Sequence, residues 1–255
     1  MRNYNDANEN VINTYKLNHE NQTLQYVTDI KNRYLKFDKT EMTIWDAITL
    51  SDSIVDESDP DIHLSQIYHY FQTAENVRQL YPNDEELHLV GLIHDLGKIM
   101  LLQAFGALPQ WSVVGDIYPV GCQFSDKIVY SEFFNNNPDK YNLYGNYTPN
   151  IGLDNVTMSW SHDEYLYQVL KNHQACKLSD QSLRIIRYHS FYAFHTENTY
   201  HHLANNDDMQ LKPILKQFSQ CDLYSKDDNN VLDINNLKPY YIKLINKYCP
   251  GIIRW

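Results

Sequence analysis

Residues 88–98, which read HLVGLIHDLGK, decide the fold of this chain. Their apolar positions favour a helix, and Asp84 is placed to cap its start. His94 projects from this otherwise apolar helix, and Asp95 follows at once. Burying an imidazole and a carboxylate without a partner would cost several kcal/mol, so both side chains need one. The segment therefore predicts a buried helix that carries a polar site at its end.

A metal ion is the partner that accepts an imidazole and a carboxylate together. Neighbouring helical positions point about 100° apart, so Asp95 can give one oxygen to the metal that His94 binds and the other to a second metal. Lys98 lies one turn beyond Asp95 on nearly the same face, where its ammonium can meet an anion or a polarised hydroxyl. The pattern favours a bridged dinuclear site. The alternatives are a solvated His-Asp pair at a helix edge and a lysine that reaches solvent.

Further candidate metal ligands lie on separate helical segments and have apolar or aromatic neighbours. They are His69, His162, His189 and Asp222. The helices of a bundle converge on an interior, where dinuclear sites are built from inward side chains. A ligand set of nitrogen and oxygen suits iron or manganese, and less specifically zinc, and argues against copper–thiolate or iron–sulfur chemistry. Periodicity alone does not rank His69 above His63.

Helical periodicity continues outside this segment and indicates a mainly α fold. Helices are expected at 44–55, at 61–81 with Asp61 as the N-cap, at 161–173, at 182–194 and at 237–248. Residues 103–160 hold most of the glycines together with short apolar runs, which indicates a long loop or small-hairpin excursion. We therefore expect residues 1–255 to form a single helical domain.

Composition excludes several classes of partner. The formal net charge of -11 disfavours a broad nucleic-acid interface, because phosphates would be repelled. The four cysteines form no CxxC pair, which argues against a zinc knuckle or a redox dithiol and favours reduced thiols. The first residues lack a signal-peptide pattern, and no stretch approaches the ~20 apolar residues that span a bilayer. We expect a cytoplasmic monomer without membrane partners.

Practically the whole chain resembles the myo-inositol oxygenase family, through a series of sequence blocks in the family's order. The blocks are RNY (2–4), TYKLNHENQT (14–23), VDESDPD (55–61), FQTAE (71–75), HLVGLIHDLGK (88–98), PQWSVVGDIYPVGC (109–122), GLDNVTMSWSHDEYLYQV (152–169), RYHSFYAFHT (187–196), DLYSK (222–226) and PYYIKLINKYCPG (239–251). Blocks of this length in this order are highly specific.

The resemblance implies an HD-domain type of helical fold around two iron ions in a mixed-valent Fe(II)/Fe(III) state. The implied ligands are His69, His94 and Asp222 for one iron and His162 and His189 for the other, with Asp95 bridging. In the pair His162-Asp163 the ligand is then the histidine. Asp163 points about 100° away, so we expect it at the surface or in a supporting position, where replacement by asparagine is mild.

The same blocks imply that the chain cleaves the ring of myo-inositol with O2 to give D-glucuronate, with Asp95 and Lys98 as catalytic residues. The implied substrate contacts are Arg2, Asp56, Glu57, Ser58, Lys98, Gly115, Asp116, His189, Ser190 and Lys226. The runner-up is an HD-domain metal-dependent phosphohydrolase, which would use much the same ligands. The sequence shows no clear arginine-rich phosphate pocket for it. A catalytically silent metal-binding module is the third interpretation.

Overall fold

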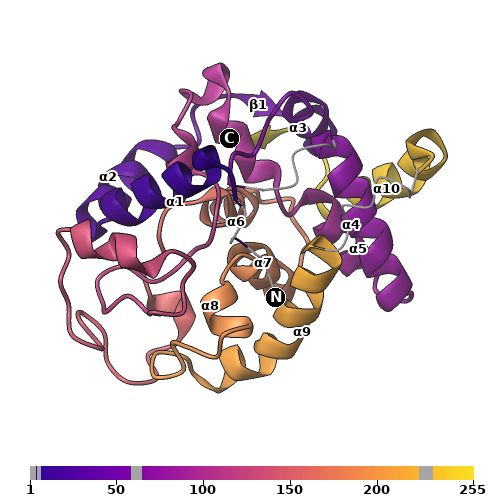
Figure 1. The fold of residues 1–255 in the computed structure, drawn as a ribbon. Helices are drawn as coiled ribbons and strands as arrows, with labels where there is room; N and C mark the ends of the chain where they lie inside the picture. Colours follow the sequence, from indigo (N-terminus) through magenta and orange to yellow (C-terminus); the bar gives the residue numbers. More distant parts are fainter. Residues whose placement is uncertain (1–3, 5–6, 59–64, 224–231) are drawn as a thin grey trace.

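Helices dominate the computed structural model, which describes residue 4 and residues 7–58, 65–223 and 232–255 (Figure 1). The helices are α1 (Glu9–Asn21), α2 (Leu24–Tyr34), α3 (Ile44–Ser51), α4 (Gln66–Leu80), α5 (Glu85–Ile93), α6 (His162–Asn172), α7 (Asp180–Tyr188), α8 (Tyr192–His195), α9 (Asn206–Leu223) and α10 (Ile234–Tyr248). Strands β1 (Glu41–Met42) and β2 (Ile253–Arg254) pair antiparallel. The predicted mainly α fold is confirmed. No helix of the described residues is long and apolar enough to cross a membrane.

Capping side chains begin the helices that carry the candidate site. Asp84 caps α5, as predicted, and its carboxylate accepts a hydrogen bond from the main-chain N–H of Leu87 at 3.0 Å. Ser161 caps α6 at the predicted position. The predicted N-cap Asp61 lies outside the described residues, and α4 begins at Gln66 after Ser65.

Two predicted helices end earlier in the structure than expected. The helix expected at 182–194 is interrupted after Tyr188, and a separate short helix starts at Tyr192. Tertiary hydrogen bonds replace the helical ones at this break, because the Ser190 N–H donates to Asp163 and the Ser190 carbonyl accepts from Ile117. The helix expected at 44–55 stops at Ser51, whose carbonyl accepts from the N–H of Ile54 in a turn.

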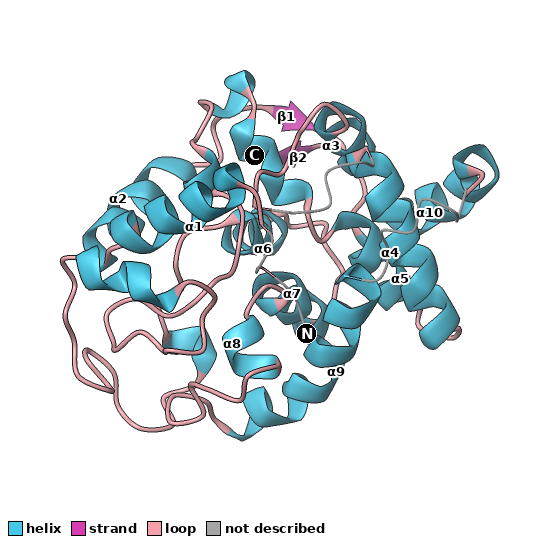
Figure 2. Ribbon diagram, viewed as in Figure 1, coloured by secondary structure: helices cyan, strands magenta, loops and turns pink. Residues whose placement is uncertain are grey.

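The central excursion is a set of loops and short 3-10 helices, which are η2 (Gln103–Phe105), η3 (Gln110–Ser112), η4 (Ser131–Asn136) and η5 (Leu153–Asn155) (Figure 2). The small hairpin considered for this stretch is not formed. Instead, an isolated antiparallel bridge joins Pro119 to Met158, two residues that are distant in sequence. The bridge joins an early part of the excursion to its end, shortly before the chain enters α6 at His162.

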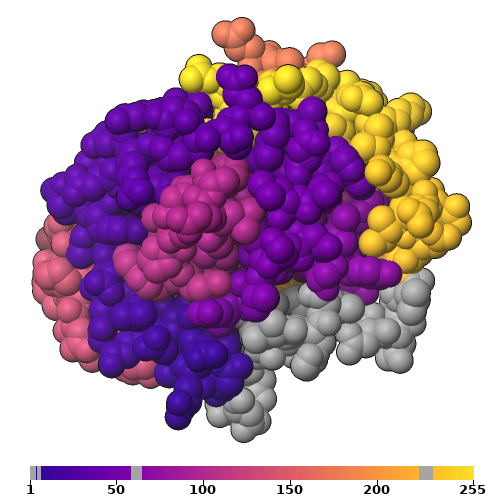
Figure 3. Space-filling view, turned by 90° about the horizontal axis from the view of Figure 1, so that it is seen from above, coloured from indigo at the N-terminus to yellow at the C-terminus, as the bar shows by residue number. Residues whose placement is uncertain are grey.

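Close helix packing brings the site elements together. Helices α4 and α5 pack against each other, and a Cβ at Gly91 would lie 2.9 Å from the Cα of Ala74, so this crossing requires glycine. Helix α9 packs against α4 and α7, and η1 (Leu96–Leu101) packs against α6. Strand β2 pairs with β1, α10 packs against α3, and Trp255 is fully buried. Figure 3 shows the C-terminal part of the chain, in yellow, beside purple segments from the N-terminal third.

Candidate metal centre

The six predicted metal ligands converge from five helices in the interior of the described structure. His69 lies on α4, His94 and Asp95 follow α5, His162 opens α6, His189 follows α7, and Asp222 lies in the last turn of α9. Figure 1 shows these helices grouped around one another. His69, Asp95, His162 and His189 are buried, and His94 is fully buried.

One half of the centre is formed by two imidazoles and two carboxylates. The Nε2 atoms of His69 and His94 lie 3.1 and 3.2 Å from the same oxygen, Oδ1 of Asp222. They also lie 3.3 and 3.5 Å from Oδ2 of Asp95. Four donor atoms from three parts of the chain therefore surround one point, which is the arrangement that a metal ion requires.

The other half uses the second oxygen of the same carboxylate. Oδ1 of Asp95 lies 3.1 Å from Nε2 of His162 and 3.5 Å from Nε2 of His189. The two Nε2 atoms of these histidines are 3.3 Å apart. Asp95 thus presents one oxygen to each pair of histidines, and its geometry is that of a carboxylate able to bridge two ions.

The tautomers of the histidines fit a cation at this position. Nδ1 of His162 lies 2.8 Å from the carbonyl oxygen of Val113, and Nδ1 of His189 lies 2.8 Å from that of Ile186. A ring nitrogen beside a carbonyl donates its hydrogen, so in the neutral ring Nε2 keeps the lone pair. Two such lone pairs 3.3 Å apart repel each other unless a cation or a proton lies beside them. The donor set therefore fits a metal ion of the nitrogen- and oxygen-binding class.

The charges of the centre reinforce this fit. Burial alone would raise the pKa of Asp95, but His94 and Lys98 hold it well below its usual range. Burial would lower the pKa of His69, but hydrogen bonds to Asp222 and Asp95 raise it to about 9. Without a metal these carboxylates attract protons to the histidines, so metal binding must displace protons.

Lys98 lies between two buried carboxylates instead of reaching solvent. Its Nζ donates to Oδ2 of Asp95 at 2.7 Å and to Oδ2 of Asp56 at 2.8 Å. Burial would lower the pKa of Lys98, but Asp56 and Asp95 raise it well above its usual value, so the ammonium stays charged. Asp56 in turn accepts from the N–H and hydroxyl of Ser58 at 2.9 and 2.6 Å. The alternative of a solvent-directed lysine is wrong.

Three other predicted substrate contacts, Gly115, Asp116 and Ser190, contact Tyr15 or the neighbouring Ile117. Asp116 is buried and its Oδ1 accepts from the hydroxyl of Tyr15 at 3.1 Å. Gly115 has a φ of +92°, and a Cβ there would lie 3.4 Å from the ring of Tyr15. The carbonyl of Ser190 accepts from Ile117, which links this segment to the α7–α8 break.

Among the described residues, no interaction brings the side chain of Glu57 to the centre. The main-chain N–H of Glu57 donates to Oε1 of Gln110 at 3.3 Å, and its side chain is half-buried. Arg2 and Lys226 lie outside the described residues.

The structure places two further residues beside the ligands, and of the two positions expected for Asp163 it favours the supporting one. Asp163 is fully buried, so the surface position considered for it is wrong, and its Oδ1 lies 2.9 Å from Nδ1 of His189. Nε2 of His195 lies 2.9 Å from the carbonyl oxygen of His189. His88 instead packs away from the centre, between the hydroxyl of Tyr240 and a main-chain carbonyl. The repeated His-Asp dipeptide was the available signal for Asp163.

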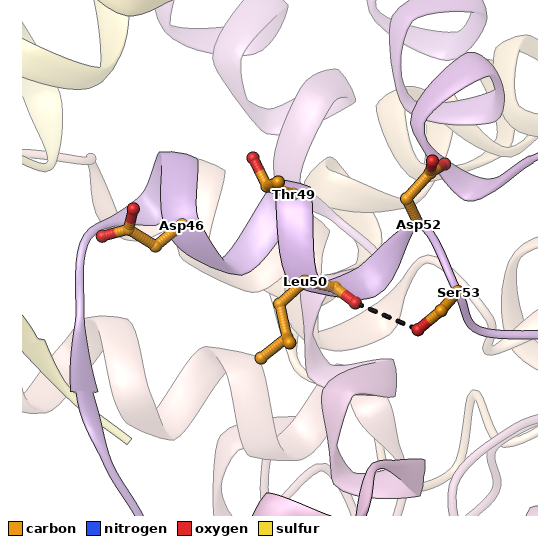
Figure 4. A pocket seen from close by; sticks show the side chains of 5 residues that line it. All are labelled: Asp46, Thr49, Leu50, Asp52 and Ser53. Carbon is orange, nitrogen blue, oxygen red and sulfur yellow. Dashed lines mark hydrogen bonds between the residues drawn. The ribbon is translucent and has the colours of Figure 1, made fainter.

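A surface hollow at the end of α3 is a different feature and offers no comparable ligand set. It is lined by Asp46, Thr49, Leu50, Asp52 and Ser53 (Figure 4). Its two carboxylates lie at opposite ends of the helix, and that of Asp46 is occupied in the capping box with Thr43. The lining contains no imidazole.

Fold and site together define a class of helical proteins whose interior His/Asp clusters can hold metal ions. Within this class the chain belongs to the myo-inositol oxygenase family, whose model matches residues 8–255. The chain is 49% identical over 246 residues to Inositol oxygenase 1 of Arabidopsis thaliana, covering 94% of this chain and 78% of the relative. It is 46% identical to Inositol oxygenase of Dictyostelium discoideum (100% and 89% covered) and 45% identical to that of Danio rerio (98% and 90%).

Proposed function

We propose that this chain is an inositol oxygenase, which opens the ring of myo-inositol with O2 to give D-glucuronate and water. The substrate supplies four electrons, and one O2 molecule accepts them, so no external reductant is needed. The observation that carries the proposal is Asp95, which presents one oxygen to each pair of histidines and contacts the buried ammonium of Lys98. Membership in the family and the names of its relatives support the same activity.

We propose that the centre holds two iron ions in the Fe(II)/Fe(III) state. His69, His94 and Asp222 would hold one ion, His162 and His189 the other, and Asp95 would be shared. When bound, such ions polarise alcohol oxygens and take part in the reduction of O2. The half with His162 and His189 draws on fewer side chains, which leaves room for two neighbouring hydroxyls of the cyclitol.

The chain's own groups would orient the substrate and manage its proton. The ammonium of Lys98 is held 2.7 Å from Asp95, where it can stabilise an inositol oxygen as the oxygen loses its proton. Asp56 and Ser58 would line one side of the bound cyclitol. The carboxylate of Asp56 can accept hydrogen bonds from ring hydroxyls, and the hydroxyl of Ser58 can donate or accept them. Gly115, Asp116 and Ser190 would line another side, and Glu57, Arg2 and Lys226 complete the proposed contacts.

A phosphohydrolase is the less favoured function. Arg184 and Arg187, the described arginines nearest in sequence to the site residue His189, form ion pairs with carboxylates outside the proposed ligand set. Arg184 pairs with Asp208, and Arg187 pairs with Glu164 through a 2.7 Å contact. A phosphate group would need free guanidinium or comparable donors at the centre. Lys98, already bound to two carboxylates, is better suited to a neutral polyol than to a phosphoester.

We further propose a cytoplasmic, monomeric enzyme. Cys122, Cys221 and Cys249 are buried as free thiols, which suits a reducing compartment. Sedimentation of the iron-loaded protein tests the monomer, and fractionation of the source cells tests the compartment.

The activity itself is tested with protein that has been loaded with iron without oxygen and then given myo-inositol and O2. We expect one D-glucuronate formed for each O2 consumed, and no activity in His162→Ala loaded in the same way. Release of phosphate from phosphoesters without oxygen consumption, in the absence of glucuronate, would replace the oxygenase by the hydrolase.

A further inference from the structure

The carboxylate of Asp163 lies beside the centre but belongs neither to the proposed ligands nor to the proposed substrate contacts. It is fully buried. Its Oδ1 lies 2.9 Å from Nδ1 of His189 and accepts from the main-chain N–H of Ser190 at 3.3 Å. Its Oδ2 has no hydrogen-bond partner and lies 3.4 Å from Nε2 of His162. Every one of these contacts is to a residue of the proposed site.

These contacts tie the start of α6 to the break between α7 and α8. Asp163 is the second residue of α6, directly after His162, whereas His189 and Ser190 follow the end of α7. The helical hydrogen-bond ladder stops at this break, so the N–H of Ser190 needs another acceptor, and Asp163 supplies it. One side chain therefore fixes two proposed site residues relative to a third.

A carboxylate has a specific effect on a metal-binding histidine. When it accepts from one ring nitrogen, it fixes the tautomer and makes the other nitrogen a stronger donor to the metal. The carbonyl oxygen of Ile186 also lies 2.8 Å from Nδ1 of His189, so both Ile186 and Asp163 orient the ring. The carbonyl carries no net charge, whereas Asp163 adds a negative charge on the side of the centre that contains His162 and His189.

We propose that Asp163 is a positioning residue, which holds His189 and the main chain of Ser190 so that the His162/His189 half of the centre binds its metal ion. The unpartnered Oδ2 adds negative charge beside His162 and favours a cation there. This inference rests on the proposed function for the identity of the centre, but it concerns metal affinity and is testable without substrate or O2.

The test is anaerobic equilibrium dialysis of the metal-free protein against Fe(II), with bound ions counted per chain. We expect Asp163→Ala to weaken one of two ions by ~10–100-fold and to leave the other unchanged. His189→Ala should weaken the same ion. Asp163→Asn keeps an oxygen acceptor but not the charge, so its Fe(II) affinity should lie between those of the wild type and Asp163→Ala. If the alanine variant does not fold, the asparagine variant provides the test.

A double-mutant cycle separates positioning through His189 from a general structural role. In the His189→Ala background, Asp163→Ala should cause little further loss of Fe(II) affinity, because its target is already absent. A full, additive loss in that background would overturn the proposal, as would unchanged Fe(II) affinity in both single variants at position 163. A wild-type protein that binds no Fe(II) would instead refute the proposed function.

Asp208→Ala is the matched control for removal of a buried carboxylate. Asp208 is also fully buried, and it accepts main-chain hydrogen bonds from Leu153 and Asn205 at 2.9 and 2.8 Å. Its partners lie outside the centre, so this variant should lower the melting temperature without a selective loss of one ion. If Asp163→Ala behaved in the same way, its role would be structural only.

Discussion

The ammonium of Lys98 lies between Asp95 and Asp56, and this position separates substrate binding from metal binding. We predict that Lys98→Ala retains its metal ions but binds myo-inositol ~10–100-fold more weakly, because a charged hydrogen-bond donor to the substrate is lost. Turnover should fall as well, since that donor also stabilises the developing alkoxide. The measurements are metal content after iron loading and inositol affinity by calorimetry.

Lys247→Ala is the control for loss of a lysine ion pair, because Lys247 pairs with Glu85 at 2.7 Å on the exposed surface. It should leave inositol affinity unchanged. Equal inositol affinity in Lys98→Ala and the wild type would remove Lys98 from the substrate site.

Asp95 and His94 are neighbours in sequence, but they contribute differently to the centre. Oxygens of Asp95 lie near all four histidines, whereas the carboxylate oxygens that Nε2 of His94 contacts, Oδ1 of Asp222 and Oδ2 of Asp95, are those that His69 also contacts. We predict that Asp95→Ala loses both metal ions and that His94→Ala mainly loses one, and that both lose turnover. Elemental analysis after iron loading measures this difference, and two retained ions in Asp95→Ala would exclude a bridging role.

Local sequence pattern predicted some site residues and not others. The polar pair His94-Asp95 on an apolar helix is visible in the sequence, because burial of both groups demands a partner. The choice of His69 over His63 came only from the resemblance, since both fit a helical segment. For Asp163 the pattern left a surface and a supporting position open, because a rotation of about 100° leads to the surface only for an exposed helix. At the buried start of α6, both directions face the protein.

Helix α5 ends at the centre, and a glycine determines how closely the next element approaches. A Cβ on Gly97 would lie 2.1 Å from the main-chain carbonyl oxygen of His162, and neither atom belongs to a flexible side chain. Gly97→Ala must therefore separate η1 from α6 and pull Lys98 away from its partners. We predict a loss of several kcal/mol in unfolding free energy, together with weaker Fe(II) binding, measured by urea denaturation and dialysis.

Gly251→Ala is the control for Gly97→Ala, because it introduces the same methyl group without a steric contact. Gly251 has a φ of +83°, but a Cβ there would meet nothing within 4 Å. The backbone conformation alone should cost about 1–2 kcal/mol, with no change in Fe(II) binding. Equal losses in the two variants would mean that conformation, and not the contact with His162, explains the requirement at position 97.

Element boundaries were predictable where the signal is local. Asp84 caps α5 as expected, and α6 begins where the pattern at 161–173 predicted, with Ser161 as its cap. A capping side chain acts on N–H groups two or three residues away, so its signal is local. The break after Tyr188 was not predictable, because Asp163 and Ile117 take the hydrogen bonds of Ser190 from distant parts of the chain. The start of α10 at Ile234 precedes the predicted residue 237. Its cap Asp233 was overlooked.

In the molecule as a whole, the path of the central excursion, residues 103–160, could not be predicted from the sequence. The residues that bridge, Pro119 and Met158, are far apart in the chain, so no local sequence pattern marks their pairing. An ion-pair network also joins residues that are far apart in the sequence. Glu164 on α6 contacts Arg187 on α7 at 2.7 Å and Lys31 on α2 at 2.9 Å. It thus joins the N-terminal helices to the helices of the centre.

This network should make stability depend on pH in a defined direction. Burial would raise the pKa of Glu164, but Arg187 and Lys31 lower it below its usual value. The carboxylate of Glu164 is therefore more easily ionised in the folded protein than in the unfolded chain. Its contribution to the unfolding free energy is complete above the unfolded pKa of about 4.3 and is lost as the pH falls below that value. We predict that Glu164→Gln costs about 1–3 kcal/mol at pH 7, since the buried Arg187 loses its charged 2.7 Å partner and keeps a longer, 3.2 Å contact with Asp154.

The difference in unfolding free energy between wild type and Glu164→Gln should therefore shrink as the pH falls below about 4.3. Urea denaturation at several pH values measures it, and the other carboxylates cancel in the difference because both proteins share them. Glu85→Gln, which removes the carboxylate of an exposed pair with Lys247, is the control and should change stability little at any pH. A difference that stays constant or grows as the pH falls would show that Glu164 stabilises the fold by packing and not by charge.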